Sequence, residues 1–149
     1  MYGDTDVMRR RVDQLREQAT DLRQLADQLV ARTAGTGWTG RAAESLSDRV
    51  RERAARLREA AAGHDRAADS LQAHLQEVDR VKDAIAQRER KALGLVTDAR
   101  ARVARVESQA AADPAGVTRT ADPGDRRLAA FDPPPPGHRD WLGVHLPGL

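Results

Sequence analysis

The chain has 149 residues, of which 32% are charged and 3% aromatic, and its 25 basic and 23 acidic residues leave a formal charge of +2. Any core must therefore be built from Leu, Val, Ile and Ala, a composition typical of helix bundles and coiled coils and not of an ordinary α/β enzyme. The two signs of charge alternate along the chain, which favours solvated helix faces over a nucleic-acid-binding surface. The absence of cysteine excludes disulfides, thiolate metal sites and cysteine nucleophiles.

The first predicted element is an amphipathic helix over about residues 5–33. Its apolar residues recur at steps of three and four, which is the helical period: Met8, Val12, Leu15, Ala19, Leu22, Leu25, Ala26 and Leu29. Asp4 and Asp6 place negative charge at its start, where the helix dipole favours it. Glycines in the turn at 34–40 end the helix, because glycine accepts the left-handed dihedral angles of helix C-termini.

A long second helix is predicted over about residues 41–92, with Thr39 as its candidate N-cap. Its apolar stripe keeps a seven-residue spacing, which predicts supercoiling with a neighbouring helix, through Val50, Leu57, His64, Leu71, Val78, Ile85 and Ala92. Beyond Gly94 the periodicity extends to about Gln109. This last stretch either continues the same helix or forms a short third helix that folds back.

The sequence changes character near residue 110, so the prediction is a helical domain over 1–110 and a disordered Pro-rich tail over 111–149. The tail holds all seven prolines and shows no helical periodicity. A polyproline run precedes Trp141 and Leu142, which form a candidate motif for docking on a partner. Plain disorder is the alternative.

The glycine-rich turn predicts an all-α antiparallel hairpin. We expect Trp38 to fill the gap where the two helix axes splay, burying on the order of 200 Å², while Gly40 lets the chain pass close beneath the ring. A second interpretation is that the indole is an anchor that another protein grips.

The stretch Trp38-Thr39-Gly40, with the small and apolar residues that follow it to Leu46, resembles the Trp-x-Gly turn of the WXG proteins. These are small helical-hairpin substrates of type VII (ESX) secretion systems in actinobacteria and firmicutes, and the resemblance covers about residues 4–90. It implies pairing with a second WXG-type hairpin in a four-helix bundle and recognition by a type VII secretion ATPase.

Two features depart from that family. Its export motif, Tyr-x-x-x-Asp/Glu, normally follows the second helix, whereas the only tyrosine here is Tyr2, so its match with Asp6 lies at the opposite end of the hairpin. The long second helix and the Pro-rich tail also exceed the compact form of the family. Both departures favour a divergent branch, or a subunit exported with a partner that carries the signal.

Helix lengths give a separate argument for a partner. A first helix of about 28 residues is roughly 42 Å long and, paired antiparallel, reaches only to about residue 70 of the second. Leaving the apolar side chains beyond that point exposed forfeits about 1.5–3 kcal/mol each. Unless the segment after Gly94 folds back, they form the expected interface with a partner or with a second copy in a homodimer: Leu71, Leu75, Val78, Val81 and Ile85.

No pattern of catalytic residues is found, so the protein is not expected to be an enzyme, and no metal or other cofactor is predicted. His64 and His74 are ten residues apart and point in different directions, so they form no metal-binding pair. If His64 lies in a dimer seam, its protonation loosens the interface. The basic cluster Arg100, Arg102 and Arg105 is interpreted as a solvated face.

The sequence therefore predicts a WXG-like type VII secretion-associated protein that acts by helical association. The alternative is a cytoplasmic coiled-coil scaffold or chaperone-like adaptor that is not exported. The N-terminus has no apolar stretch typical of a signal peptide, and no segment is long and apolar enough to span a membrane. The expected location is outside the cell, reached without a cleavable signal, with the cytoplasm as the alternative.

Overall fold

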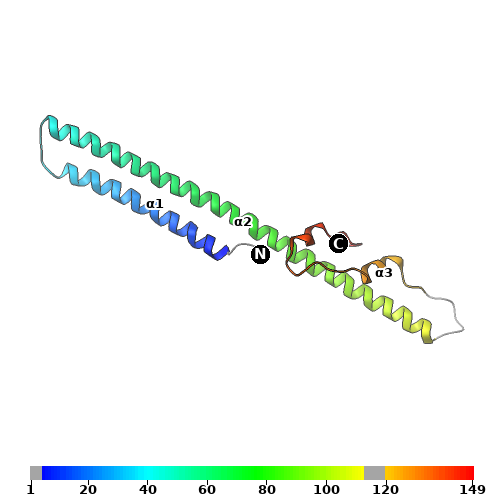
Figure 1. Ribbon diagram of the computed structural model, residues 1–149. Coiled ribbons are helices and arrows are strands. Elements are labelled where there is room, and N and C mark those ends of the chain that lie inside the picture. Colours follow the sequence, from blue (N-terminus) through cyan, green and yellow to red (C-terminus); the bar gives the residue numbers. More distant parts are fainter. Residues whose placement is uncertain (1–4, 113–119) are drawn as a thin grey trace. The chain divides into compact units, whose positions relative to one another are not determined.

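The computed structural model describes residues 5–112 and 120–149, and the regular structure within these ranges is entirely helical. The elements are α1 (Thr5–Ala34), α2 (Arg41–Ala112), a short α3 (Pro123–Ala129) and a 3₁₀ turn η1 (Arg139–Gly143) (Figure 1). The chain forms two compact units, Met1–Val78 and Asp79–Leu149, and α2 contributes to both. The predictions for Tyr2 and Asp4 lie outside the described residues.

In the first unit α1 packs antiparallel against the beginning of α2, which confirms the predicted hairpin (Figure 1). Polar side chains join the two helices in pairs: Arg16 with Asp69 and Gln72, Arg23 with Asp65, and Arg58 with Asp27. As the residue number rises along α1, that of its partner falls along α2. These pairs therefore fix one antiparallel register.

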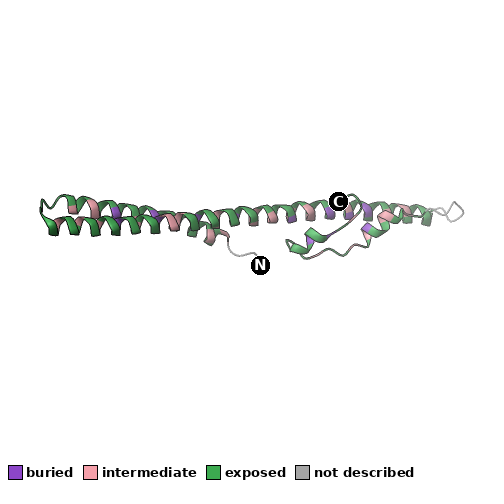
Figure 2. Ribbon diagram, turned by 90° about the horizontal axis from the view of Figure 1, so that it is seen from above, coloured by how far each residue is buried: buried purple, intermediate pink, exposed green. Residues whose placement is uncertain are grey.

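Alanines form most of the seam between α1 and α2. Five of them are fully buried at seven-residue spacing within each helix: Ala19, Ala26, Ala54, Ala61 and Ala68. The leucines of the neighbouring heptad position, such as Leu22 and Leu57, are half-buried. Small side chains let two helices approach closely. In Figure 2 the buried residues recur along the facing sides of the two helices.

The helix α2 continues without a break to Ala112, so the alternative of a folded-back third helix before residue 110 is wrong. Gly63 and Gly94 both lie inside it. A glycine in a helix costs about 1 kcal/mol relative to alanine, which the surrounding helix tolerates. The seven-residue apolar pattern continues through both glycines, and the packing of these apolar residues keeps α2 helical there.

The second unit contains the main difference from the sequence prediction, because residues 120–149 are not a disordered tail. They pack on the part of α2 after Asp79 and bury Trp141, which is 1% exposed, against Ile85 and Ala92. Val81, Phe131, Leu146 and Leu149 pack against the same cluster. The prolines limit regular helix in this segment to short stretches, but they do not prevent burial of the apolar residues between them.

Local capping explains how the Pro-rich segment forms short helices. The Asp122 carboxylate accepts hydrogen bonds from the backbone N–H groups of Gly124 and Asp125, and Pro123 occupies the first turn of α3. Aspartate before proline is a favourable helix start, because the proline has no N–H to leave unpaired. At η1 the His138 ring accepts from the Asp140 N–H in the same way.

Enlarging a seam alanine should destabilise the hairpin. We expect Ala61→Leu to lower the free energy of unfolding by about 1–3 kcal/mol, because the close approach of the helices leaves no room for the added carbons. Urea unfolding followed by circular dichroism measures the change. The neighbouring Ala60 is exposed, so Ala60→Leu is the matched control and should be nearly neutral. Equal stability of the two variants would contradict the alanine seam.

Candidate protein-interaction surfaces

The turn between α1 and α2 is shaped by two glycines on either side of Trp38. Gly37 and Gly40 have φ angles of 64° and 96°, in the left-handed region that side chains disfavour. The Gly40 carbonyl accepts the first hydrogen bond of α2, from the Glu44 N–H at 3.1 Å, so Gly40 and not Thr39 holds the cap position. The turn residues therefore fix the direction in which the chain enters α2.

The prediction that Trp38 fills the end of the hairpin is wrong, because this residue is 70% exposed. A gap of about 100 Å³ does exist there between Val30 and Val50, but the indole does not enter it. The physical reason is the glycine-shaped turn, which carries Trp38 outside the pair of helices. An aromatic side chain of this size left in water loses the stabilisation that its burial would give.

Trp38 borders a shallow depression of about 500 Å³ on the first turns of α2. Its other lining residues combine a small apolar floor with charged groups: Ala43, Glu44, Ser47, Asp48 and Arg51. Arg51 pairs with Asp48 at 3.1 Å, and both side chains are well exposed. An exposed indole beside a polar rim has the composition of the anchors found at protein interfaces.

Two of the expected interface residues, Leu71 and Leu75, are covered by the chain itself. They form an apolar cluster with Val12, Ala68 and the α1 residues Met8 and Leu15. The estimate that α1 reaches only to residue 70 is therefore wrong. Because α1 begins at Thr5 and the turn is tight, α1 extends over at least one further turn of α2.

The next expected interface residues, Val81 and Ile85, also have neighbours within the chain, in the second unit. Both belong to the cluster around Trp141 and Val144, and Ile85 is 2% exposed. Val78 is half-buried. The argument for a partner from helix lengths therefore fails at these positions, because the C-terminal segment supplies the cover.

The two residues of the candidate tail motif differ in burial: Trp141 is buried and Leu142 is exposed. The Trp141 indole N–H donates to the Pro135 carbonyl at 3.0 Å, and its ring lies 6.3 Å from that of Phe131 at a tilt of 57°. Leu142, by contrast, is 44% exposed. Trp141 is therefore an internal anchor of the second unit, whose polar atom is satisfied without water.

Charged side chains of α2 hold the backbone of the C-terminal segment. Arg88 donates to the Val144 carbonyl at 2.5 Å, and Arg100 donates to the Ala129 carbonyl at 3.1 Å. Glu89 accepts from the Gly137 N–H at 3.0 Å. Sequence reasoning missed these roles and took the arginine cluster as a solvated face. No signal could identify them without knowing that the tail folds.

Arg102 and Asp125 form the best-aligned of these contacts. Two nitrogens of the guanidinium donate to the two carboxylate oxygens at 2.9 and 2.6 Å. This hydrogen-bonded contact lowers the pKa of the Asp125 carboxyl below its ordinary value. Asp125 lies in the first turn of α3, so the pair ties that helix to α2.

His64 lies in the alanine seam of the first unit, half-buried between Ala61 and Ala68 along α2. Its Nδ1 atom is buried and has no hydrogen-bond partner. Within residues 5–112 and 120–149, no group of three or more metal-ligating side chains is placed to hold a metal ion. His64 therefore lies in a seam within one chain, and its Nδ1 atom is an unsatisfied polar group in that seam.

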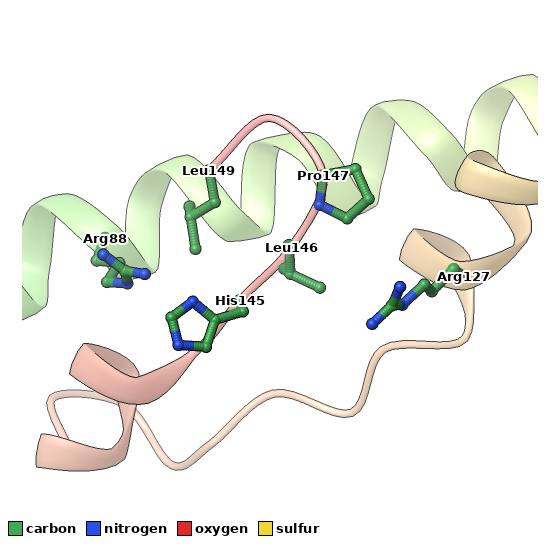
Figure 3. Close-up of a pocket in the computed structure, with 6 residues that line it drawn as sticks. All are labelled: Arg88, Arg127, His145, Leu146, Pro147 and Leu149. Carbon is green, nitrogen blue, oxygen red and sulfur yellow. The ribbon is translucent and has the colours of Figure 1, made fainter.

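A second depression, of about 260 Å³, lies beside the last residues of the chain (Figure 3). Arg88, Arg127 and His145 border it together with Leu146, Pro147 and Leu149. In Figure 3 these C-terminal residues run alongside α2, and the arginines approach from α2 and α3. The lining contains no carboxylate or hydroxyl side chain that would make a nucleophile and base pair.

No family model, curated protein or solved structure matches this chain. Within the described ranges, no helix combines the length and the apolar character needed to cross a membrane. The candidate surfaces that remain are the Trp38 turn, which is exposed, and the α2 face after Asp79, which the C-terminal segment covers.

Acidification should loosen the C-terminal segment. The lowered pKa of Asp125 means that its pairing stabilises the second unit above the ordinary aspartate pKa and is lost as pH falls through the lowered value. Hydrogen exchange of the amides in α3, compared at neutral and strongly acidic pH, measures the effect. Asp125→Asn should remove part of the pH dependence. An unchanged profile in this variant would contradict the role of the pair.

Replacing His64 by leucine should stabilise the first unit. The change removes a buried nitrogen without a partner, and we expect the free energy of unfolding to rise by about 1–2 kcal/mol. Urea denaturation measures it. His74 is exposed on the same helix, so His74→Leu is the control and should have little effect. A destabilised His64→Leu variant would show that the imidazole has a partner in solution.

Proposed function

We propose that this protein acts by binding another helical protein through the Trp38 turn, as a WXG-like component associated with type VII secretion. The observation that carries the proposal is the exposure of Trp38, 70% in a chain with only two tryptophans. A large aromatic side chain held in water by two left-handed glycines is costly for the hairpin alone. A partner that buries the indole recovers the hydrophobic stabilisation.

The hairpin supports this proposal in a second way. Its fully buried positions are mostly alanines, so each layer of the seam buries little apolar surface. Other apolar side chains of the first unit remain exposed, among them Val7, Leu25 and Leu46. Val7 and Leu25 are 18 residues apart, five full helical turns, so they lie on one face of α1. A second hairpin packing on the first would cover such positions.

The resemblance to WXG proteins gives the proposal its cellular setting. The Trp-x-Gly tripeptide lies in the turn of an antiparallel hairpin, at the position where that family has it. The second candidate is a scaffold or adaptor that stays in the cytoplasm. It is favoured by the position of the only tyrosine, Tyr2, because residues 113–149 contain no Tyr-x-x-x-Asp/Glu motif.

Export is tested in the organism that encodes the protein, by immunoblotting cells and culture supernatant. We expect the protein in the supernatant, and its loss from the supernatant when the type VII secretion ATPase is deleted. Trp38→Ala should abolish export while leaving the circular dichroism unchanged, because the side chain packs on little of the hairpin. Leu142→Ala, also exposed but in the second unit, is the control and should be exported normally.

Retention of the wild-type protein inside the cell would reject export and favour the scaffold. Export of Trp38→Ala at the wild-type level would reject the Trp38 turn as the recognised surface.

A further inference from the structure

We propose that residues 120–149 are a removable cover over a self-complementary apolar face of α2, and that removing this cover lets two copies of the chain pair antiparallel through that face. The face consists of Val81, Ile85, Ala92, Val96, Ala99 and Val103. This inference names a partner, a second copy, and uses a surface other than the Trp38 turn. It therefore extends the proposed association. Binding through the Trp38 turn and pairing through α2 can each fail while the other holds.

The face is symmetric along the helix. Ile85 and Ala99 lie seven residues before and after Ala92, and Val81 and Val103 lie eleven residues before and after it. When a second copy runs in the opposite direction, Ala92 meets Ala92, Ile85 meets Ala99 and Val81 meets Val103, while Val96 meets Arg88. Three of these four kinds of pair are apolar on both sides, and the aliphatic stem of Arg88 can cover Val96 in the fourth. A twofold interface requires such a self-complementary surface, in which the same patch serves both subunits.

The centre of the face suits close helix pairing. Ala92 is fully buried beneath the C-terminal segment, and its side chain is a single methyl group. Small residues at the crossing point allow two helices to approach, as the alanine seam of α1 and α2 already shows in this chain. Seven-residue spacing of the apolar positions is the pattern that favours such pairing.

The cover differs from a helical partner in how it is attached. It is mostly irregular and has one large buried anchor, Trp141. Its polar attachments come largely from arginine side chains that remain exposed, so these groups regain water when the segment leaves. The cover and a second copy need the same residues of α2, so they exclude each other.

The covalent connection favours the cover in the intact protein. A segment tethered to its own binding face has a high effective concentration, which a second copy exceeds only when the cover is weakened. The wild-type protein should therefore be monomeric at low concentration. Weakening the anchor should turn it into a dimer.

Sedimentation velocity over a range of protein concentrations tests this directly. We expect Trp141→Ala to sediment as a dimer at concentrations where the wild type is a monomer. Leu142→Ala removes an exposed apolar side chain from the same short helix, so it is the matched control and should remain monomeric. Hydrogen exchange of residues 128–144 reports whether the cover has been released.

A Trp141→Ala monomer whose cover has been released overturns the proposal. If the cover stays bound in that variant, the double variant Trp141→Asp/Val144→Asp places charges at two of its three buried apolar positions, and a monomer in this variant also overturns the proposal. A wild-type protein that is already dimeric at the lowest concentration contradicts the exclusion of a second copy by the cover.

A disulfide test fixes the register, because the native chain has no cysteine. In the Trp141→Ala background, Ala92→Cys should form a disulfide-linked dimer on mild oxidation, since the two Cα atoms meet at the twofold axis. Ala101→Cys is the control, because nine residues along a helix reverse the direction of the side chain. Equal cross-linking of the two variants would reject the antiparallel arrangement about Ala92.

Discussion

The apolar stripe of α2 is the constraint on which the rest of the structure depends. A helix of 72 residues cannot leave such a stripe in water, because every exposed aliphatic side chain weakens the folded state. Two different parts of the chain provide the cover. The first helix covers the stripe as far as Leu75, and the C-terminal segment covers it from Val81 onward. The requirement for a partner that the sequence suggested is met within the chain at these positions.

Different kinds of contact hold the two covers on α2. The α1 cover is a regular helix whose alanines and interhelical ion pairs fix a single register over many layers. The C-terminal cover has one aromatic anchor and arginines that bind its backbone carbonyls. A regular seam distributes its stabilisation over many small contacts, whereas an anchored segment depends on a few. The second cover is therefore the part of the molecule most suited to rearrangement.

Periodicity and the glycine-rich turn predicted the hairpin and the bounds of α1, because the spacing of apolar residues reports which side of a helix is buried. Periodicity left open whether the stretch beyond Gly94 continued the second helix or folded back, and α2 continues to Ala112. Periodicity could not predict the C-terminal fold, since Trp141 becomes buried only against a surface formed by distant residues of α2. One local signal was present: Asp122 before Pro123 is a helix start, and the surrounding prolines obscured it. The exposure of Trp38 was missed because composition favours burial of an indole, while the direction of the turn depends on the left-handed glycines.

The two tryptophans provide the most direct measurement of the central claim, that the chain covers its own stripe with Trp141 while Trp38 stays in solvent. Acrylamide quenching of the intrinsic fluorescence should resolve two populations in the folded protein, one accessible and one protected. The Trp38→Phe variant, which keeps only Trp141, should show the protected population alone until urea unfolds it. Quenching of Trp141 as strong in the folded protein as in urea would contradict the account, because the C-terminal segment would then not be packed on α2.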